Sequence, residues 1–223
     1  MENVNVIKSK NQLKREARLL RKLEMRKKRP KKRSKVPRFK ESTDRIISGS
    51  IIIDMNFNDL MNSNEKSSLA GQLARVYALN RRSISQFRLQ YLDTNKNSRL
   101  EYINAKFPDS EKWNVSWIDD FESGLDSCIY LTADSENILE CIEDDKTYII
   151  GGLVDRNRHK GVSKLRAEAL NIRTARLPIK ENITLRTTHI LTVYHVFEIL
   201  LKYKETKDWK ISIESTLPKR KLN

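Results

Sequence analysis

Short β-branched runs alternate with helix-forming stretches along most of the chain, and this alternation constrains the fold more than any other feature. SIIIDM at 50–55 predicts a strand, and the stretch 65–82 predicts a helix with apolar residues on one face. The pattern continues with strands expected over 85–93, 128–134, 147–155 and 174–179, and helices over 97–107, 160–171 and 186–205. Such alternation favours an α/β fold, a mainly parallel sheet with helices on both faces.

Polar residues follow several of the predicted strands. Asp54 ends the first one, Thr132 and Asp134 follow CIYL, and Gly151 and Asp155 follow TYII. Because ligands of open α/β sheets bind outside the carboxyl ends of the strands, we expect the site there. GGLVD lacks the third glycine of a dinucleotide fingerprint, and the sequence contains no GxxxxGK[ST] phosphate loop.

Charge is distributed unevenly along the 223 residues, whose net charge is +15. Residues 1–40 carry a net +14, whereas residues 41–223 carry +1. Within the latter part, 119–145 hold ten Asp/Glu and no Lys/Arg, and 156–186 hold nine Lys/Arg and two Glu. A basic segment beginning beside Asp155 suits a polyanionic substrate, although ordinary solvated helix faces are the alternative interpretation.

Several classes of protein are disfavoured by composition. A hydrophobic content of 38% supports a packed core. Apolar runs are shorter than the roughly 18–20 residues of a membrane helix, so we expect no membrane partner. Cys128 and Cys141 are too few for a disulfide framework and favour a reducing compartment. The three histidines and two cysteines lack zinc-site spacing, so we expect no metal, and the charged N-terminus does not resemble a signal peptide.

The N-terminal arm is expected to be a partly helical, solvated segment. A helix is predicted over 11–28, Pro30 ends it, and a linker runs to residue 44. RNA phosphates are the natural partner of this charge. The candidate contacts are Lys27, Lys28, Arg29, Lys31, Lys32 and Arg33. The same KKRPKKR run also resembles a nuclear signal, and a mitochondrial transit peptide or plain solubilising charge are further alternatives; we expect the nucleus, the cytoplasm or both.

An ordered series of segments carries a family resemblance. It comprises YLTADSENIL (130–139), YIIGGLVDRNRHKG (148–161), ARLPI (175–179) and the C-terminal stretch 190–221, together with DMNFNDLM (54–61) and QLARVYALNRR (72–82). The series closely resembles the eukaryotic tRNA position-9 methyltransferases of the SPOUT superfamily. The resemblance implies a C-terminal trefoil knot, a rare exception to unknotted topology, and a monomer without an obligatory protein partner. It divides the chain into the arm and linker 1–44, a SPOUT domain 45–215 and a basic tail 216–223.

The resemblance implies methyl transfer from S-adenosylmethionine to N1 of guanosine 9 in tRNA, with S-adenosylhomocysteine as product. The implied cofactor-binding residues are Leu131, Thr132, Gly151, Gly152, Val154, Leu177, Pro178, Ile179, Thr188, Leu191 and Thr192. The implied RNA-binding residues of the body are Asp54, Gln72, Arg81, Arg82, Arg156, Asn157, Arg158 and Lys160. For Asp54 and Gln72, a local cap and a solvated helix face are the respective alternatives.

Asp155 is the candidate catalytic residue because guanine N1 must lose a proton when it attacks. It is the only acid in GGLVDRN, and it is expected to accept the proton, to position the base, or both. The alternative is a loop aspartate that caps the turn after a strand. Adenosine-9 or dual-purine specificity, action on another RNA, and a non-catalytic basic RNA-binding factor remain alternatives. Thr188 and Thr192 are also interpreted as contacts at the start of the last helix, and Thr192 alternatively as a buried helix residue that bonds back to the carbonyl four residues earlier. Tyr194 stands where the family commonly has a small polar residue.

Overall fold

The computed structural model describes residues 9–28, 45–94, 101–121, 124–184 and 191–218. The chain divides into two units, residues 1–40 and residues 41–223. In the first unit, helix α1 (Lys10–Lys28) confirms the predicted arm helix. The side chains of α1 that are described, including Leu13 and Leu20, are exposed.

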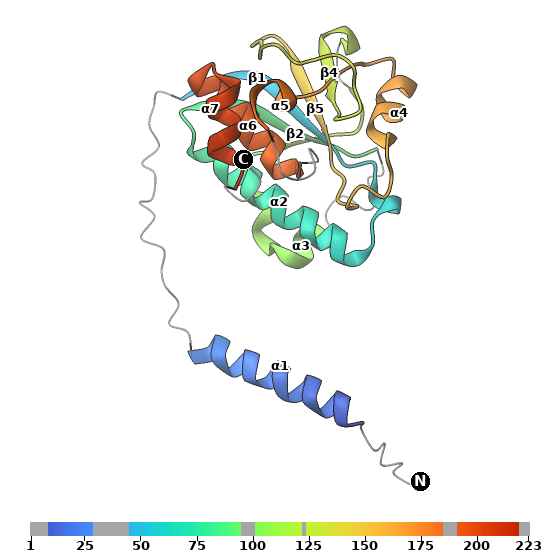
Figure 1. Cartoon of the computed structure of the whole chain (residues 1–223), viewed down its shortest axis with the longest axis vertical. Helices are drawn as coiled ribbons and strands as arrows, with labels where there is room; N and C mark the ends of the chain where they lie inside the picture. The colour runs from blue at the N-terminus through green and yellow to red at the C-terminus, as the bar shows by residue number, and fades with distance from the viewer. Residues whose placement is uncertain (1–8, 29–44, 95–100, 122–123, 185–190, 219–223) are drawn as a thin grey trace. The chain divides into compact units, whose positions relative to one another are not determined.

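The second unit is built on a six-stranded sheet (Figure 1). The strands are β1 (Ile46–Asp54), β2 (Ser85–Leu92), β3 (Ser116–Ile118), β4 (Cys128–Leu131), β5 (Thr147–Gly151) and β6 (Arg173–Ala175). Their order is β3-β2-β1-β5-β4-β6, and each neighbouring pair is parallel. The predicted parallel α/β sheet is therefore confirmed, and all carboxyl ends of its strands lie at one edge.

Helices cover both faces of this sheet, as predicted. They are α2 (Ser63–Arg82), α3 (Glu101–Lys106), α4 (Val162–Ala169), α5 (Ile179–Asn182), α6 (Val193–Thr206) and α7 (Trp209–Thr216), with the short 3-10 turns η1 (Asn58–Leu60), η2 (Pro108–Lys112) and η3 (Leu125–Ser127). Alternation along β1 separates two cores: Ile51 and Ile53 pack with residues of α2 and α6, whereas Ile52 packs with Ala167 of α4. The larger core thus lies on the α2 and α6 side.

Some sequence predictions fail at element boundaries. The strand expected over 174–179 is wrong, because β6 ends at Ala175 and Ile179 begins α5. Residues 186–190 of the helix expected over 186–205 lie outside the described residues, and α6 begins at Val193 after Thr192 as its N-cap. The short strand β3 and the helix α7 were not predicted. Because α7 reaches Thr216 and Leu217 is buried, the packed body extends past the expected boundary at 215.

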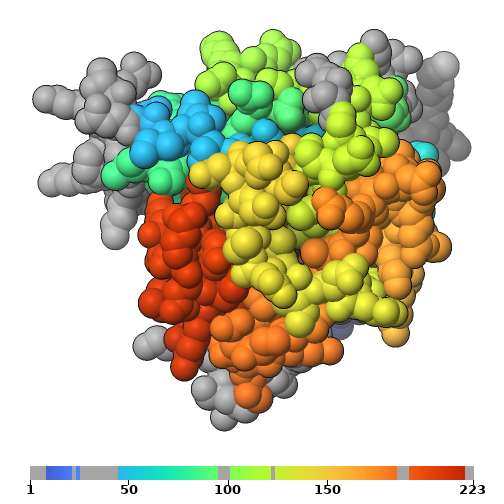
Figure 2. All heavy atoms as spheres, turned by 90° about the horizontal axis from the view of Figure 1, so that it is seen from above, coloured from blue at the N-terminus to red at the C-terminus, as the bar shows by residue number. Residues whose placement is uncertain are grey.

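Residues 119–145, here called the acidic segment, lie partly on the surface beside the C-terminal helices. Figure 2 shows it in yellow-green and yellow, between the red α6–α7 region and the orange α4 region. Trp209 of α7 donates its Nε1 hydrogen to the main-chain oxygen of Glu140 at 2.7 Å and stacks on Tyr203 of α6. The bond from Trp209 fastens the backbone at Glu140 to the larger core, while the side chain of Glu140 remains exposed.

Candidate functional site

A cavity of about 440 Å³ lies at the edge of the sheet where the parallel strands end. This volume falls in the range of small-molecule sites. Its walls come from the segments following β4, β5 and β6 and from the first turns of α4 and α6. The lining residues are Leu131, Thr132, Ala133, Asp134, Ile150, Gly151, Leu153, Asp155, Asn157, His159, Lys160, Gly161, Val162, Ser163, Arg176, Leu177, Ile179, Lys180, Leu191, Val193 and Val196.

Six of the predicted cofactor-binding residues line this cavity: Leu131, Thr132, Gly151, Leu177, Ile179 and Leu191. Gly152, Val154, Pro178 and Thr192 belong to the same segments but are not part of its wall. Thr188 lies outside the described residues. Thr192 is an exposed N-cap whose hydroxyl accepts a hydrogen bond from His195 N at 3.2 Å, so the interpretation of Thr192 as a buried helix residue is wrong.

The two glycines after β5 allow a close approach of backbones. Gly152 N donates to the main-chain oxygen of Asp54 at 2.7 Å, and a Cβ on Gly152 would stand only 2.6 Å from that oxygen. At Gly151, a Cβ would stand 2.9 Å from Ser163 Oγ, an atom of the cavity wall. Glycine therefore keeps β1, β5 and α4 together at the cavity edge.

Asp155 organises the turn that forms one wall of the cavity. Its Oδ1 accepts from Asn157 N and its Oδ2 from His159 N, each at 2.8 Å. Between them, Arg156 and Asn157 adopt left-handed backbone with φ of 54° and 62°, which costs non-glycine residues about 1–2 kcal/mol each. The carboxylate thus caps the turn, as the alternative interpretation predicted, and offsets the strain that presents Asn157 to the cavity.

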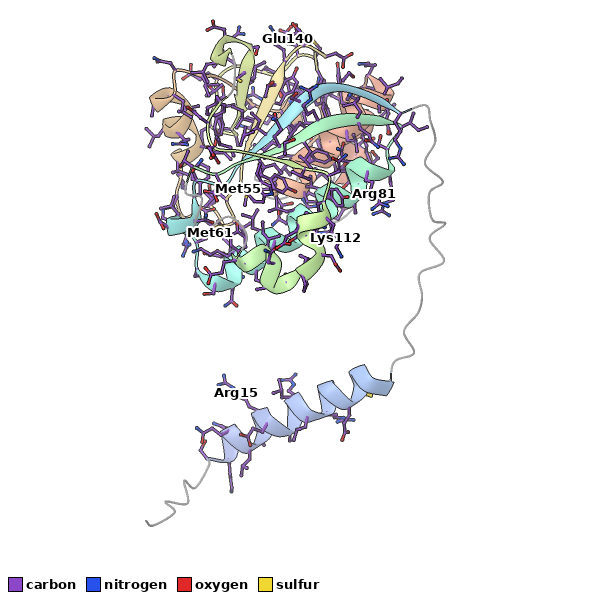
Figure 3. The ribbon with its side chains drawn as sticks, turned by 180° about the vertical axis from the view of Figure 1, so that it is seen from behind. Arg15, Met55, Met61, Arg81, Lys112 and Glu140 are labelled. Atoms are coloured by element: carbon purple, nitrogen blue, oxygen red, sulfur yellow. The ribbon has the colours of Figure 1, made fainter. Side chains whose placement is uncertain are left out.

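Asp54 and Gln72 do not lie on a surface, so the expectation that they contact RNA is corrected. Asp54 is fully buried, and Gln72 is 3% exposed. Gln72 Oε1 accepts a hydrogen bond from Tyr194 N at 3.3 Å, which joins α2 to the start of α6. Burial also excludes the solvated helix face that was the alternative for Gln72. Figure 3 labels Met55, the residue after Asp54, in the interior near Met61.

The basic residues of the body that were predicted to bind RNA differ in their exposure and in whether they are already bonded within the protein. Arg81 and Arg82 are exposed at the end of α2, and Figure 3 labels Arg81 there. Arg156 is exposed and Lys160 lines the cavity. Arg158, in contrast, is bound through Nη2 to Glu65 at 2.9 Å and to the main-chain oxygen of Leu60 at 3.1 Å. Arg158 therefore fastens the Asp155 turn to the start of α2.

The basic arm is described only in part. Lys27 and Lys28 complete α1, while Arg29, Lys31, Lys32 and Arg33 lie outside the described residues.

Sequence reasoning missed several lining residues. Arg176 and Lys180 flank the LPI segment; Arg176 forms a two-pronged pair with Glu181, at 3.0 and 2.7 Å, and this hydrogen bonding lowers the pKa of Glu181. Val193 and Val196 belong to the apolar stripe of the last helix, and their spacing gives no sign that they face a cavity. Asp134 was visible as a polar residue after a strand.

The described part of the chain shows neither a group of metal ligands nor a membrane-spanning helix. Within it, His, Cys, Asp and Glu side chains do not gather in a group of three or more that suits a metal ion. Its helices also include none of the length and apolarity needed to cross a membrane.

Comparisons with known proteins point to one family. The family model described as tRNA (guanine(9)-N(1))-methyltransferase TRM10/TRM10A matches residues 2–222. The tRNA (guanine(9)-N1)-methyltransferase of Kluyveromyces lactis is 40% identical over 175 residues, which cover 78% of this chain and 59% of that protein. The tRNA methyltransferase 10 homolog A of Homo sapiens is 37% identical over 179 residues, covering 77% of this chain and 51% of that protein. This chain thus spans between half and two thirds of the length of these relatives.

A solved structure agrees with this match. The crystal structure of full-length spTrm10 in complex with SAH has 32% sequence identity and a TM-score of 0.69, covering 80% of this chain and 100% of that chain.

Proposed function

Because this chain belongs to the tRNA (guanine(9)-N(1))-methyltransferase TRM10/TRM10A family, we propose that it methylates N1 of guanosine 9 in tRNA with S-adenosylmethionine as donor. The observation that carries the proposal is the cavity at the carboxyl edge of the sheet, where Leu131, Gly151 and Leu177 meet Asp155. A wall with apolar side chains and one buried acid suits a small cofactor beside a base that must lose a proton.

The residues present fit the cofactor. Leu131, Leu177, Ile179, Leu191 and Val193 offer apolar surface to the nucleoside, while the glycine at 151 keeps the wall free of a Cβ. When bound, S-adenosylmethionine supplies an electrophilic methyl group. The chain's own role is to enclose that group and bring the purine edge to it, which is the source of a large part of the rate in such two-reactant reactions.

Asp155 can hold the turn by hydrogen bonds and also accept the proton of guanine N1. Each carboxylate oxygen has two lone pairs, and the turn uses one hydrogen bond per oxygen. Asp155 is 9% exposed and lines the cavity, so a purine edge in the cavity can reach it. We assign to Asp155 the positioning of the Asn157 turn and acceptance of the N1 proton. Adenine N1 carries no proton, so a strong requirement for the carboxylate would favour guanosine.

The deciding experiment maps the product. Unmodified tRNA is incubated with the protein and S-adenosylmethionine, and the modified position is located by primer extension and mass spectrometry. Methylation of N1 of guanosine 9 is expected. A methyl group at another position, or on adenosine, would reject the stated specificity. No transfer together with no thermal shift on adding cofactor would leave the non-catalytic RNA-binding factor as the better account.

Two variants test whether the Asp155 carboxylate is needed for turnover. Asp155→Asn should lower turnover by about 10²-fold, because it removes the proton acceptor and one acceptor of the turn. Asp126→Asn, an exposed acid outside the cavity, is the matched control and should turn over normally. Wild-type turnover in Asp155→Asn would show that the carboxylate is not needed as a base.

Several finer features belong to the same proposal. The convergence of the segments after β4, β5 and β6 with the start of α6 supports a trefoil knot in this part of the chain. We propose a monomer without an obligatory protein partner, located in the nucleus, the cytoplasm or both.

The exposed, basic helix α1 supports a role of the arm in holding tRNA. Deleting residues 1–40 should weaken tRNA binding and flatten its salt dependence; an unchanged salt slope would exclude the arm as a contact.

A further inference from the structure

We propose that Arg166 is a positioning residue for the methyl transfer, acting through the buried carboxylate of Asp54. Arg166 lies on α4 and Asp54 ends β1, 112 positions earlier in the chain. The inference rests on the proposed function for its turnover measurements, but it is carried by the contacts of four residues, Asp54, Asn56, Tyr130 and Arg166, here called the Asp54 cluster.

Among the described residues, the hydrogen bonds of the Asp54 carboxylate come from this cluster. Oδ2 accepts from Arg166 Nε and from the Tyr130 hydroxyl, both at 3.1 Å. Oδ1 accepts from Asn56 N at 3.1 Å and from Asn56 Nδ2 at 2.7 Å. A carboxylate with no exposed surface is costly unless it is paired and hydrogen-bonded, and Arg166 is the cation that pairs with it.

The cluster joins segments that continue directly into the cavity wall. Tyr130 precedes Leu131 and Thr132 on β4, and the main-chain oxygen of Asp54 holds Gly152 N. Ser163 lies one helical turn before Arg166 and also lines the cavity. A displacement of the Arg166 side chain would therefore be transmitted to three parts of the wall: the ends of β4 and β5 and the first turn of α4.

Few side chains of helix α4 are buried, although Gly161 N donates a hydrogen bond to Asp134 Oδ2 at 3.2 Å. It has eight residues, its N-cap Gly161 provides no side-chain cap, and Ala167 is its single buried residue. Leu165 is 64% exposed. Apolar burial is non-directional, and one alanine contributes little of it. The charge-assisted bond from Arg166 to Asp54 is directional, so it sets both the position and the rotation of α4 over the sheet.

Another role of a basic residue in this region would be to bind a tRNA phosphate. The geometry favours positioning, because the Nε hydrogen of Arg166 points into the protein and is used on a fully buried partner. The two roles predict different kinetics. A positioning residue affects the rate of the assembled complex, whereas a phosphate contact affects tRNA affinity and its salt dependence.

The experiment uses the full chain and compares Arg166→Met and Arg166→Lys with the wild type. Arg166→Met should lower kcat by about 10- to 100-fold, leave the KM for tRNA within about twofold, and weaken S-adenosylhomocysteine binding in calorimetry. Arg166→Lys keeps a cation next to Asp54 and should recover part of both losses. Lys204→Met is the matched control: Lys204 is also a buried cation bonded to β1, but it lies far from the cavity wall, so kcat and S-adenosylhomocysteine affinity should be unchanged.

Tyr130→Phe covers the possibility that Arg166→Met fails to fold. It removes a single hydrogen bond to Asp54 with nearly no change in volume, and a kcat reduced about three- to tenfold is expected. The proposal is overturned if the folded variants keep wild-type kcat and cofactor affinity, or if Arg166→Met instead raises the KM for tRNA and flattens its salt dependence. Absence of methyl transfer by the wild type would reject the proposed function alone. The positioning role of Arg166 would still be tested by calorimetry, which compares the S-adenosylhomocysteine affinity of the variants with that of the wild type.

Discussion

The two ends of β1 are each held by a cation from a helix, but in different ways. At the amino end, Lys204 of α6 donates from Nζ to the main-chain oxygens of Ser48 and Gln86 and lies 4.4 Å from the centre of the Phe87 ring. At the carboxyl end, Arg166 of α4 binds the buried side-chain carboxylate of Asp54. One cation satisfies backbone carbonyls, and the other neutralises a charge.

Because of this difference, we expect the amino end of β1 to affect mainly the stability of the fold and the carboxyl end to affect mainly the shape of the cavity. Lys204 joins two adjacent strands and a helix of the larger core, so its loss should reach the stability of the whole body. The carboxylate of Asp54 collects donors from β4 and α4, elements that continue into the cavity wall. Changes at the carboxyl end should therefore affect turnover more than changes at the amino end that cost the same stability.

Gly152→Ala should produce the largest effect, at the carboxyl end. Its Cβ would stand 2.6 Å from the Asp54 oxygen and 3.1 Å from Met55 Sδ, and the backbone shift would break the 2.7 Å bond from Gly152 N. We expect a loss of about 3 kcal/mol or more in the free energy of unfolding, measured by urea denaturation, together with loss of cofactor binding.

Gly161→Ala is the control for the loss of a glycine as such. Gly161 has φ of 74°, but no atom lies within 4 Å of its missing Cβ. Only left-handed strain is added, so about 1 kcal/mol should be lost. Equal losses in the two variants would mean that the close approach at Gly152 is not what requires glycine.

Asn80→Ala probes the amino end. Asn80 lies on α2, where its Nδ2 donates to Phe87 O at 2.9 Å and its Oδ1 accepts from Phe87 N at 3.0 Å. Removing both bonds in a site that is 8% exposed should cost about 2 kcal/mol, with turnover of the folded protein unchanged. Asn64→Ala, exposed on the same helix, should stay within about 0.5 kcal/mol of the wild type. Reduced turnover in Asn80→Ala well below its melting temperature would break the separation of the two ends.

The fold was predictable where local chemistry and periodicity agree. Asn62 and Glu65 form the capping box that begins α2, a start signal visible in the sequence, and β1, β2, β4 and β5 follow apolar runs. The strand predicted over 174–179 failed because the chain leaves the sheet after Ala175 to bond with the acidic segment: Arg176 O accepts from Leu139 N. Such a partner, almost forty positions away, leaves no local trace.

The residues of the site also fall into those that the sequence allows one to predict and those that depend on contacts between distant elements. The rule that ligands bind at strand carboxyl ends brought Thr132, Gly151 and Asp155 together correctly, while Leu131 was implied by the family resemblance. It gave no means to see that Asp54 is buried against Arg166, because the pairing depends on how α4 lies over the sheet. Gln72 was equally hidden: its position on α2 is clear from the pattern, but its partner, Tyr194 N, belongs to α6.

Thr192→Ala tests a smaller part of the carboxyl end. The Thr192 hydroxyl caps α6 by accepting from His195 N, and the neighbouring Leu191 and Val193 line the cavity. Loss of the cap should cost about 1 kcal/mol and weaken S-adenosylhomocysteine binding in calorimetry, while Thr192→Ser restores both. If the cofactor affinity of Thr192→Ala equals that of the wild type, the first turn of α6 does not shape the cavity.

The smallest expected effect is the pH dependence at the amino end. Burial lowers the pKa of Lys204 below its ordinary value of 10.5, with Asp144 opposing the shift. As pH rises towards 10.5, the folded protein loses this proton before the unfolded chain does, so the unfolded state binds more protons and the free energy of unfolding rises.

Comparison with Lys204→Met isolates this contribution, because other groups titrate in both proteins. Urea denaturation from about pH 8 to about pH 10 should show the free energy of unfolding of the wild type rising relative to that of the variant. A flat or falling difference would mean that the carbonyls of Ser48 and Gln86 stabilise the ammonium enough to cancel its desolvation. The amino end would then be a matched charge site like the Asp54 cluster, and the contrast between the ends would rest on turnover alone.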